Sequence, residues 1–542
     1  MLNQRLPRSE LEQTLKEYIN SVDFILKEIS DLDTSVIFDK DLMGKLHHAL
    51  NIPNYANSDF RKNLLKHADE GDLKKFMITI GLAESTITNE EILQLISKAA
   101  SFSWGDNKET KAFAEIFGYE QSIIPKYVTK SETIEKIKVS EKPLKTLKEY
   151  QTKIFFESTK LVENPWTRFI IRMPTGAGKT RTALEVVSHF LNTGLEKDEK
   201  RQVVWIADRE ELCEQAIEAM QEIWPHIGKE ELTLYRAWGG AKIEKFEDFS
   251  FIVATYQTLN SMLKNNKQFP TPHLVISDEA HNVLAPTHQE ALRKLEENGT
   301  RIVGLTATPV RGIDTSENKK LQEYFNDQLI EIDSGEINAI EFLQGEGYLS
   351  HYIPTTIPSN RQFNLSTDQR RKFEVERDLP SGLLDEIASD NERNIKIAEI
   401  LRDLKEENSQ ILYFAPNVKQ SKFMCALLLA LGAKAAHVDG SSPSAYRKDV
   451  VEKFRKGEIN FIFNYNVFST GFDAPNIDVV FIARPTTSIV LHQQMIGRGM
   501  RGPKMGGTET FKLFRVVDDL PAIDLADEYF SEIWNPEIIK TE

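Results

Sequence analysis

A glycine-rich loop, PTGAGKT at residues 174–180, is the part of the chain whose residue types and spacing most suggest chemistry. It follows an apolar run at 169–173, typical of a buried β-strand, and precedes a helical stretch at 181–191. A loop between a strand and the start of a helix is the setting in which backbone N–H groups bind phosphate. The strict pattern has glycine where Met173 stands, so the match is incomplete.

Four residues of this loop have roles that follow from their types. Gly176 and Gly178 allow the backbone to turn with its N–H groups toward phosphate oxygens. The Lys179 ammonium group is placed to reach the β- and γ-phosphates, and the Thr180 hydroxyl is a ligand for Mg²⁺. We therefore expect a nucleoside triphosphate site that uses magnesium, and we disfavour the alternative of a chance glycine-rich turn.

A pair of carboxylates follows a second apolar run, at residues 274–277. Asp278 would hold the magnesium ion through water, and Glu279 would polarise the attacking water. Such a pair is weak evidence alone, because acidic residues often cap helices. Together with the upstream phosphate loop it is strong, since one element supplies phosphate donors and the other the metal carboxylate.

Two arginines near the C-terminal end could complete the same site. Arg498 and Arg501 are three residues apart within QMIGRGMR at 494–501, so we expect both on one helix face. Two guanidinium groups suit a triphosphate reached from across a cleft, the arginine-finger role. In isolation, solvated or salt-bridged arginines would be the better interpretation, but the phosphate site in the same chain favours the finger.

The elements that must position these groups form two regions, at about 144–329 and 330–520, in which short β-branched runs alternate with helical stretches. Such runs are typical of parallel strands buried on both faces. The expected strands are 169–173, 203–207, 251–254, 274–277 and 302–305 in the first region, and 411–414, 435–438, 460–464 and 479–482 in the second. A polar, irregular segment at 353–380 could be an insertion or a lid.

The first 143 residues differ from the rest, being poor in glycine and rich in Leu, Ile, Lys and Glu. Residues 59–67 and 90–100 read as helices, and 129–143 as a charged linker ending in proline. Near the N-terminus, six apolar residues follow one another at alternating spacings of four and three, which places them on one helix face. This pattern favours a helix packed on its neighbours over a coiled coil. The residues on that face are Leu11, Leu15, Tyr18, Val22, Ile25 and Ile29. The sequence thus predicts a helical N-terminal domain followed by two α/β domains.

Composition limits the classes of protein. The 542 residues carry a formal net charge of -15, which argues against a protein that coats DNA but allows a local basic groove. Cys213 and Cys425 are too few for a disulfide framework or a four-cysteine zinc site, and we expect both to be buried in helices. The sequence shows no bilayer-spanning apolar run and no apolar leader segment, so we expect a cytoplasmic protein without membrane contact.

Taken in order, the motifs resemble those of the superfamily 2 helicases and translocases. The match covers about 144–520 and is specific, because eight motifs occur in the right order. The late motifs look nearest to the motor subunits of type I and type III restriction enzymes and to RadD-type bacterial repair helicases; similar motors occur in anti-phage defence systems. The motifs are YQ at 150–151, MPTGAGKT at 173–180, ADR at 207–209, TYQ at 255–257, DEAH at 278–281, TAT at 306–308, TGFD at 470–473 and QMIGRGMR at 494–501.

The resemblance implies an α/β fold: two tandem RecA-like domains with parallel sheets, preceded by an all-α N-terminal domain. The implied boundaries are 1–143 for the helical accessory domain, 144–335 for the ATP-binding domain, and 336–542 for the second motor domain with a short C-terminal extension. The implied cofactors are ATP and Mg²⁺.

It also implies roles for single residues. Gln151 would read the adenine, and Thr175 and Ala177 would bind nucleotide with the rest of the loop. Gly471 and Asp473 would lie at the interdomain ATP cleft. The residues implied to contact nucleic acid are Arg209, Thr255, Gln257 and Thr470, and those implied to couple hydrolysis to movement are His281, Thr306 and Thr308.

Some features of the resembling families are missing. The sequence has no C-terminal cysteine cluster, so the zinc-binding tail of the RadD-type proteins is absent. Asp106, with Glu109 and Lys111, is the nearest approach to a nuclease motif, and we interpret it as a solvated turn. The motor is therefore expected to carry no nuclease of its own.

The leading hypothesis is an ATP-driven motor acting on DNA, in repair, restriction or anti-phage defence. One alternative is an ATP-switched assembly subunit whose N-terminal domain binds a partner nuclease or sensor. Another is an RNA helicase, because the motifs of the two classes overlap.

Overall fold

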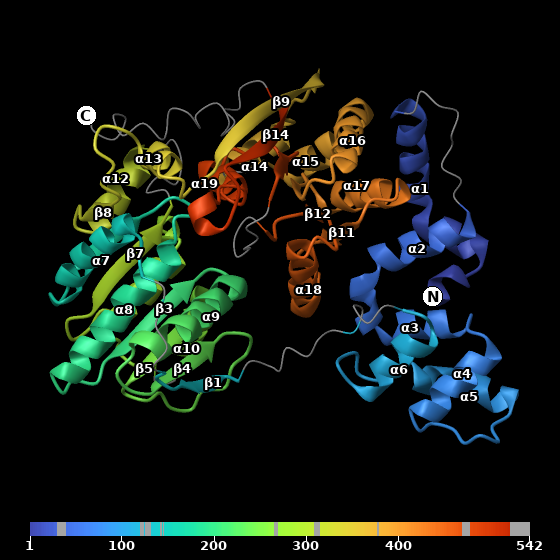
Figure 1. Ribbon diagram of the computed structural model, residues 1–542, viewed down its shortest axis with the longest axis horizontal. Coiled ribbons are helices and arrows are strands. Elements are labelled where there is room, and N and C mark those ends of the chain that lie inside the picture. The colour runs from blue at the N-terminus through green and yellow to red at the C-terminus, as the bar shows by residue number, and fades with distance from the viewer. Residues whose placement is uncertain are drawn as a thin grey trace.

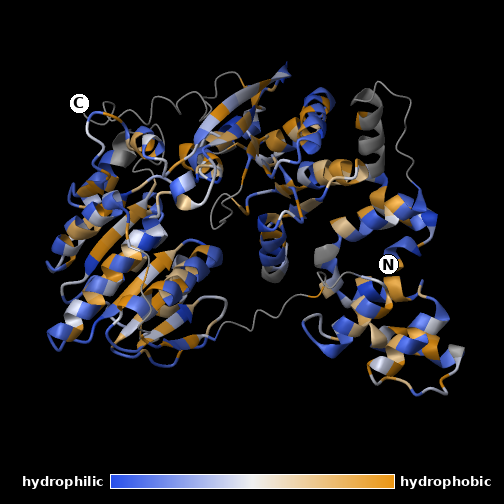
Figure 2. Cartoon of the chain, in the orientation of Figure 1, coloured by the Kyte–Doolittle hydropathy of each residue, from blue (hydrophilic) through white to orange (hydrophobic). Residues whose placement is uncertain are grey.

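The computed structural model describes residues 1–29, 39–119, 124, 132–140, 144, 146–264, 269–307, 315–376, 379–468 and 477–520. Figure 1 shows an N-terminal group of helices and two α/β domains, each built on its own sheet. The strands at the centre of each α/β domain are the most apolar part of the chain, and the outer faces of the helices are the most polar (Figure 2).

The first α/β domain contains an eight-stranded sheet in the order β1-β4-β5-β3-β6-β7-β2-β8, in which β1 is antiparallel to β4 and the other pairs are parallel. The four strands β3 to β6 are buried at every position, which is why most of them read as continuous apolar runs. The strands are β1 (Ile134–Ile137), β2 (Arg168–Arg172), β3 (Gln202–Ala207), β4 (Leu232–Ala237), β5 (Ser250–Thr255), β6 (Leu274–Asp278), β7 (Arg301–Thr306) and β8 (Leu329–Glu331).

Helices cover both faces of this sheet, because successive side chains of a strand point to opposite sides. Ile171 packs in one apolar cluster with side chains of α7, α8 and α9, whereas Ile170 packs in another with those of α10, α11 and α12. The helices are α7 (Glu149–Val162), α8 (Lys179–Glu196), α9 (Glu210–Ile227), α10 (Tyr256–Lys264), α11 (Pro286–Leu295) and α12 (Thr315–Tyr324). The carboxyl ends of the parallel strands meet at one edge of the sheet, where ligands of such domains bind.

The prediction of a linker at 129–143 is wrong for the middle of this segment. Residues 134–137 form β1, which lies at the edge of the first sheet and pairs with β4. Ile137 is buried there, and Glu135 accepts a hydrogen bond from Arg236 at 2.9 Å. This pairing partner is about a hundred residues distant, so local composition could not reveal the strand. Residues 129–131 and 141–143 lie outside the described residues.

The second α/β domain contains a six-stranded, wholly parallel sheet in the order β11-β12-β10-β13-β14-β9. Its strands are β9 (His351–Gln362), β10 (Ile411–Phe414), β11 (Ala435–Val438), β12 (Phe461–Asn464), β13 (Val479–Ile482) and β14 (Thr510–Asp519). Its helices are α13 (Ala339–Gly345), α14 (Thr367–Glu376), α15 (Ser381–Ala388), α16 (Asn391–Glu406), α17 (Val418–Ala430), α18 (Ser444–Arg455) and α19 (Ile489–Ile496).

The segment 353–380, expected to be irregular, contains most of the regular strand β9 and the helix α14. β9 is an edge strand paired on one side with β14, and most of its residues are exposed. An exposed edge strand needs few apolar residues, which explains why its sequence reads as a polar loop.

The N-terminal region is helical, as predicted, and consists of α1 (Arg8–Ile29), α2 (Lys40–Leu50), α3 (Ser58–Leu65), α4 (Glu70–Thr79), α5 (Asn89–Ala99) and α6 (Lys108–Ile116). Side-chain caps begin several helices: Asp39 accepts from Leu42 N at 2.7 Å, and Thr88 caps α5 with a reciprocal bond from Glu91. In the core, the buried Arg61 guanidinium donates to the carbonyl oxygens of Tyr55, Ala100 and Phe102.

This helical domain packs on the second α/β domain. Helix α1 contacts α16 and α17, and α2 contacts α17 (Figure 1). Leu11, Leu15 and Ile25 of α1 are buried in one apolar cluster with residues of α16 and α17, which include Leu401 and Leu428. The expected packing of this helix face is thus confirmed for these residues, while the side chains of Val22 and Ile29 lie outside the described part.

Both cysteines are free, buried and helical, as expected, in α9 and α17. Among the described helices, none is long and apolar enough to cross a membrane.

Candidate functional site

The phosphate loop lies between β2 and α8, and two of its glycines have positive φ. Gly178 (φ 81°) is the N-cap of α8, and Gly176 has φ 87°. A Cβ on Gly176 would lie 3.2 Å from the carbonyl oxygen of Met500 in the second domain. A Cβ on Gly178 would collide with the Gln151 amide nitrogen. Both positions therefore need glycine, for backbone conformation and for close approach.

Met173, which stands where the strict pattern has glycine, extends the strand side of the loop. Its N–H donates to the carbonyl oxygen of Thr306 at 3.1 Å, and its side chain is fully buried. Its φ is not among the positive values, so the backbone makes no demand for glycine at this position.

Two residues at the start of α7 hold the phosphate loop through hydrogen bonds to its backbone. The Tyr150 hydroxyl donates to the Ala177 carbonyl at 2.9 Å, and the Gln151 amide donates to the same oxygen at 3.0 Å. The Gln151 amide oxygen accepts from Lys148 N at 2.9 Å. In this structure Gln151 therefore holds the phosphate loop, and its adenine-reading role stays a prediction.

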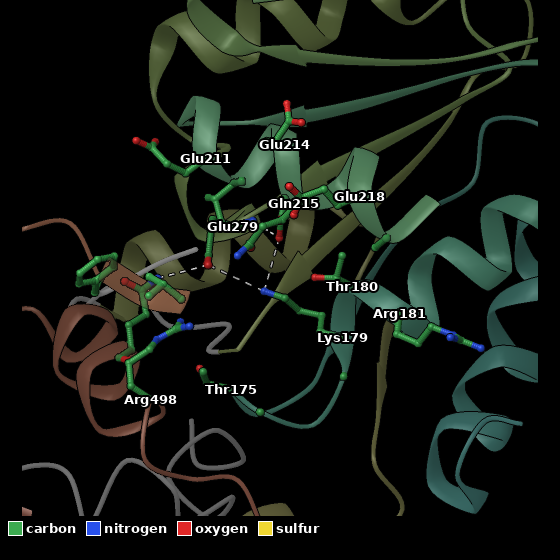
Figure 3. A pocket seen from close by; sticks show the side chains of 18 of the residues that line it. Thr175, Lys179, Thr180, Arg181, Glu211, Glu214, Gln215, Glu218, Glu279 and Arg498 are labelled. Atoms are coloured by element: carbon green, nitrogen blue, oxygen red, sulfur yellow. Dashed lines mark hydrogen bonds and ion pairs between the residues drawn. The ribbon is translucent and has the colours of Figure 1, made fainter. Parts of the chain in front are cut away.

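The two carboxylates lie beside the loop lysine. Lys179 Nζ is 3.5 Å from Asp278 Oδ1 and 3.9 Å from Glu279 Oε1. Asp278 ends β6, and Glu279 follows in the left-handed region with φ 50°, unusual for a side chain of this size. Such backbone strain is typical of functional sites. Figure 3 shows Lys179 reaching from the loop toward Glu279.

The pKa values of the two carboxyl groups in this cluster are shifted in opposite directions. Burial raises the pKa of Asp278 more than Lys179 lowers it, so the net shift is upward. Burial also raises the pKa of Glu279, but Lys179 first, and then His281 and Arg498, outweigh that effect, and the pKa is lowered. Burial lowers the pKa of Lys179, but the two carboxylates reverse this and raise it. Glu279 is thus kept ionised, as a group that must accept a proton from water needs to be.

The second domain completes the cluster. The Gln494 amide on α19 donates to Glu279 Oε1 at 3.2 Å. Arg498 and Arg501 line the same cleft as Lys179, Thr175 and Thr180, and this cleft has a volume of about 1090 Å³. Figure 3 shows Arg498 on the opposite side of the cleft from Lys179.

The expectation that both arginines lie on one helix face is wrong. Helix α19 ends at Ile496, and Arg498 and Arg501 belong to the turn that follows. A Cβ on Gly497 would lie 2.5 Å from the Thr175 side chain, and one on Gly499 would meet Phe511 at 2.6 Å. Gly497 therefore allows the chain after α19 to approach the phosphate loop closely, and Gly499 allows it to pack on β14 of its own domain. Both arginines still reach the cleft.

The donor set fits a magnesium ion that binds together with a nucleotide. Thr180 and Asp278 provide one hydroxyl and one carboxylate, the oxygen ligands that Mg²⁺ prefers. Within the described residues no group of three or more His, Cys, Asp or Glu side chains could hold a metal. An ion here would thus depend on phosphate oxygens for further ligands, as is usual for Mg²⁺ in nucleotide sites.

Two of the residues implied to couple hydrolysis to movement, His281 and Thr306, form a chain with Glu279. His281 Nδ1 is 3.4 Å from Glu279 Oε2 and 3.4 Å from the Thr306 hydroxyl, which is fully buried at the end of β7. This chain joins the carboxylate beside the phosphate loop to the segment that leaves β7. Thr308 lies outside the described residues.

Three of the residues implied to contact nucleic acid, Arg209, Thr255 and Gln257, lie at the carboxyl ends of neighbouring strands β3 and β5. Arg209 is the N-cap of α9, and its guanidinium donates to the carbonyl oxygen of Asn466 in the second domain at 2.9 Å. Thr255 accepts from Thr258 N at 3.2 Å at the start of α10, and Gln257 is exposed. Thr470, Gly471 and Asp473 lie outside the described residues.

The sequence assigns no role to two members of the site, Gln494 and Tyr150, although both lie within motifs. It also gives no sign that α9 forms one wall of the surrounding cleft, although Glu211, Glu214, Glu218 and Glu222 recur at helical spacing and line that wall. The solvated turn expected around Asp106 is wrong for Glu109 and Lys111, which belong to the first turn of α6. Asp106 precedes that helix and forms an ion pair with Lys111 at 2.6 Å.

Comparison with known families agrees with this geometry. A family model described as the res subunit of type III restriction enzymes matches residues 144–311, and one described as the helicase conserved C-terminal domain matches residues 392–502. These segments hold the phosphate loop and the carboxylates on one side, and Gln494 and both arginines on the other. The chain belongs to the superfamily 2 helicases, a family of ATP-dependent enzymes.

Curated relatives are similar over up to about two thirds of the chain. The putative ATP-dependent helicase IRC3 of Saccharomyces cerevisiae is 24% identical over 362 residues, 66% of this chain and 49% of that protein. The ATP-dependent RNA helicase DBP3 of Yarrowia lipolytica is 23% identical over 338 residues, 61% of this chain and 56% of that protein. The chain thus spans about half the length of the curated relatives it matches.

A solved structure has the same fold. The fragment of a putative HsdR subunit of a type I restriction enzyme from Vibrio vulnificus YJ016 superposes with a TM-score of 0.50 at 18% identity. The match covers 79% of this chain and 72% of that one, and supports tandem RecA-like domains.

Proposed function

We propose that the chain is a motor that hydrolyses ATP and moves along nucleic acid, with DNA as its substrate. The observation that carries this proposal is that Gln494 and Arg498 of the second domain meet Lys179 and Glu279 of the first in one cleft. A nucleotide site shared by two domains links the state of the nucleotide to the spacing of the domains. Alternating closure and opening of this cleft is what stepping along a strand requires.

The chemistry is phosphoryl transfer to water. The loop N–H groups and Lys179 bind the phosphates, and Glu279 orients the attacking water and accepts its proton. Gln494 holds the Glu279 carboxylate in position through its hydrogen bond. Arg498 and Arg501 stabilise the charge of the transition state from the second domain. Magnesium, held by Thr180 and Asp278, supplies further neutralisation of phosphate charge when bound.

For nucleic acid we propose contacts to the phosphate backbone from Arg209, Thr255, Gln257 and Thr470. Contacts of this kind position a strand without reading its sequence. They also fit a protein with a net charge of -15, because a motor needs only a local positive track.

The preference for DNA is supported by the family model of the first domain, whose description is that of a restriction-enzyme subunit. A relative named as an RNA helicase supports the alternative. We propose a role in DNA repair, restriction or anti-phage defence, on the resemblance of the late motifs to those motors.

The test is ATP hydrolysis by the purified chain alone, and with double-stranded DNA, single-stranded DNA or RNA, with Lys179→Ala as the control. We expect DNA to stimulate the wild type and the variant to be inactive. Stimulation by RNA alone would replace DNA by RNA in the proposal. No hydrolysis under any condition would overturn the motor.

A second candidate is an ATP-switched assembly subunit, with a partner nuclease bound by the N-terminal domain. The observation that favours it is the exposure of Ile78 and Leu93, at 39% and 66%, on the neighbouring helices α4 and α5. Strand separation by the purified chain alone would contradict this candidate, whereas ATP hydrolysis without any strand separation would favour it.

A further inference from the structure

Helices α9 and α18 face each other across the interdomain cleft and are joined by two ion pairs. Arg447 of α18 pairs with Glu211 of α9, and Lys448 Nζ lies 3.1 Å from Glu218 Oε1. Each pair joins the first motor domain to the second. Nothing in the proposed chemistry uses these four residues.

The spacing of the pairs gives them a mechanical property. Glu211 and Glu218 are seven residues apart on α9, which is two turns, or roughly 10 Å along the axis. Arg447 and Lys448 are adjacent on α18, so the two basic side chains diverge to reach separate points on α9. One ion pair is a pivot about which two domains can rotate, but two separated pairs also resist rotation.

Both helices are firmly attached to their own domains. Val450 and Phe454 of α18 are 2% and 0% exposed, and Ile217 and Met220 of α9 are fully buried. A force on either ion pair therefore moves a whole domain and not a loose helix.

The pairs lie on the wall of the nucleotide cleft. Glu211, Glu218, Arg447 and Lys448 line the same cavity as Lys179 and Arg498. Figure 3 shows Glu211, Glu218, Lys179 and Glu279 among the side chains that line this one pocket. The distance between α9 and α18 and the distance between Arg498 and the phosphate loop are thus set by the same arrangement of the domains.

We propose that these four residues form an interdomain latch that positions Gln494 and Arg498 against the phosphate loop before nucleic acid binds. The inference rests on the proposed function and adds its regulation. The latch favours the closed arrangement, so the apparent affinity for ATP rises with the closed fraction. The side chains are partly exposed, from 20% for Arg447 to 54% for Glu218, so each pair is weak and salt opposes it.

The test is charge reversal on each side and then on both. Glu211→Lys and Arg447→Glu each replace an attraction by a repulsion, and we expect each to raise KM for ATP about 3- to 10-fold. The value of kcat at saturating ATP stays within about 2-fold, because these residues take no part in the chemistry. The double variant Glu211→Lys with Arg447→Glu restores the attraction and returns KM to within about 2-fold of the wild type.

Glu290→Lys is the matched control. It makes the same change of charge, but Glu290 pairs at 2.8 Å with Lys294 of its own helix, so KM should not change. Binding of a fluorescent, non-hydrolysable ATP analogue is measured alongside, because it reports on cleft closure without hydrolysis. Recovery in the double variant shows that the single variants lose affinity through the charge repulsion and not through the substituted side chains themselves.

Two results would overturn the latch: single variants that bind the analogue as the wild type does, or a double variant as weak as the singles. Both differ from failure of the proposed function, in which the wild type itself hydrolyses no ATP with any nucleic acid. Analogue binding still tests the latch in that case.

Discussion

Gln494 of the second motor domain donates a hydrogen bond to Glu279 of the first, with 3.2 Å between Nε2 and Oε1. The bond crosses the cleft and ends on the carboxylate that we assign to the attacking water. Glu279 in turn lies 3.4 Å from His281, which lies 3.4 Å from Thr306. A change in the distance between the domains therefore acts directly on the carboxylate to which we assign the attacking water.

Gln494→Ala should lower kcat for ATP hydrolysis by roughly 10-fold or more with little change in KM, because it frees the Glu279 carboxylate without removing any phosphate ligand. Steady-state kinetics with saturating nucleic acid measure this. Gln215→Ala is the matched control, since Gln215 lines the same cleft from α9. Equal losses in the two variants would show that the position of Gln494 has no special importance.

Lys179 has a structural role besides phosphate binding, because its charge offsets two buried carboxylates. Lys179→Met should abolish hydrolysis and lower the free energy of unfolding by about 3 kcal/mol, the usual scale for breaking a buried ion pair. Lys179→Arg retains the charge and should stay nearly as stable as the wild type while losing most activity, since a guanidinium group does not fit the loop lysine's place. Chemical denaturation measures the stability of both variants, and an ATPase assay measures their activity. Equal stability of the Met variant and the wild type would contradict the structural role of Lys179.

The phosphate site could be predicted because its chemistry is local. Residues 174–180 contain their own turn, phosphate donors and expected metal ligand, and Asp278 ends, while Glu279 directly follows, a strand buried on both faces. The family comparisons and the two parallel sheets confirm the α/β fold that followed from these runs.

The parts that could not be predicted depend on distant pairing. Strand β1 exists because β4 lies beside it, and β9 because β14 does. The turn that carries Arg498 is decided by the contact of Gly497 with Thr175, more than three hundred residues away in the sequence. The ion pair of Glu211 with Arg447 likewise appears only when both domains are placed.

The docking of the N-terminal domain on the second motor domain predicts a clear contrast between two leucines. Leu15 of α1 is 1% exposed in the cluster shared with α16 and α17, whereas Leu93 of α5 is 66% exposed. Leu15→Ala should lower the free energy of unfolding by about 2–5 kcal/mol, and Leu93→Ala should leave it nearly unchanged. Limited proteolysis should also release the N-terminal domain faster from the Leu15 variant, and equal effects of the two substitutions would contradict the docking.

Acid should destabilise the second motor domain through His492. Burial, and to a lesser extent Arg515, lowers the pKa of His492 to about 3. In the unfolded chain an imidazole takes up a proton below about pH 6.5, so between that value and pH 3 the unfolded state binds more protons and stability falls as the pH falls. The loss of stability from this group is about 1.4 kcal/mol per pH unit below pH 6.5.

His492→Gln removes this titrating group, so the melting temperature of the variant should change less between pH 7 and pH 5 than that of the wild type. His351→Gln, at an exposed position on β9, is the control and should follow the wild type. A pH profile of the His492 variant parallel to that of the wild type would show that another group governs the acid sensitivity.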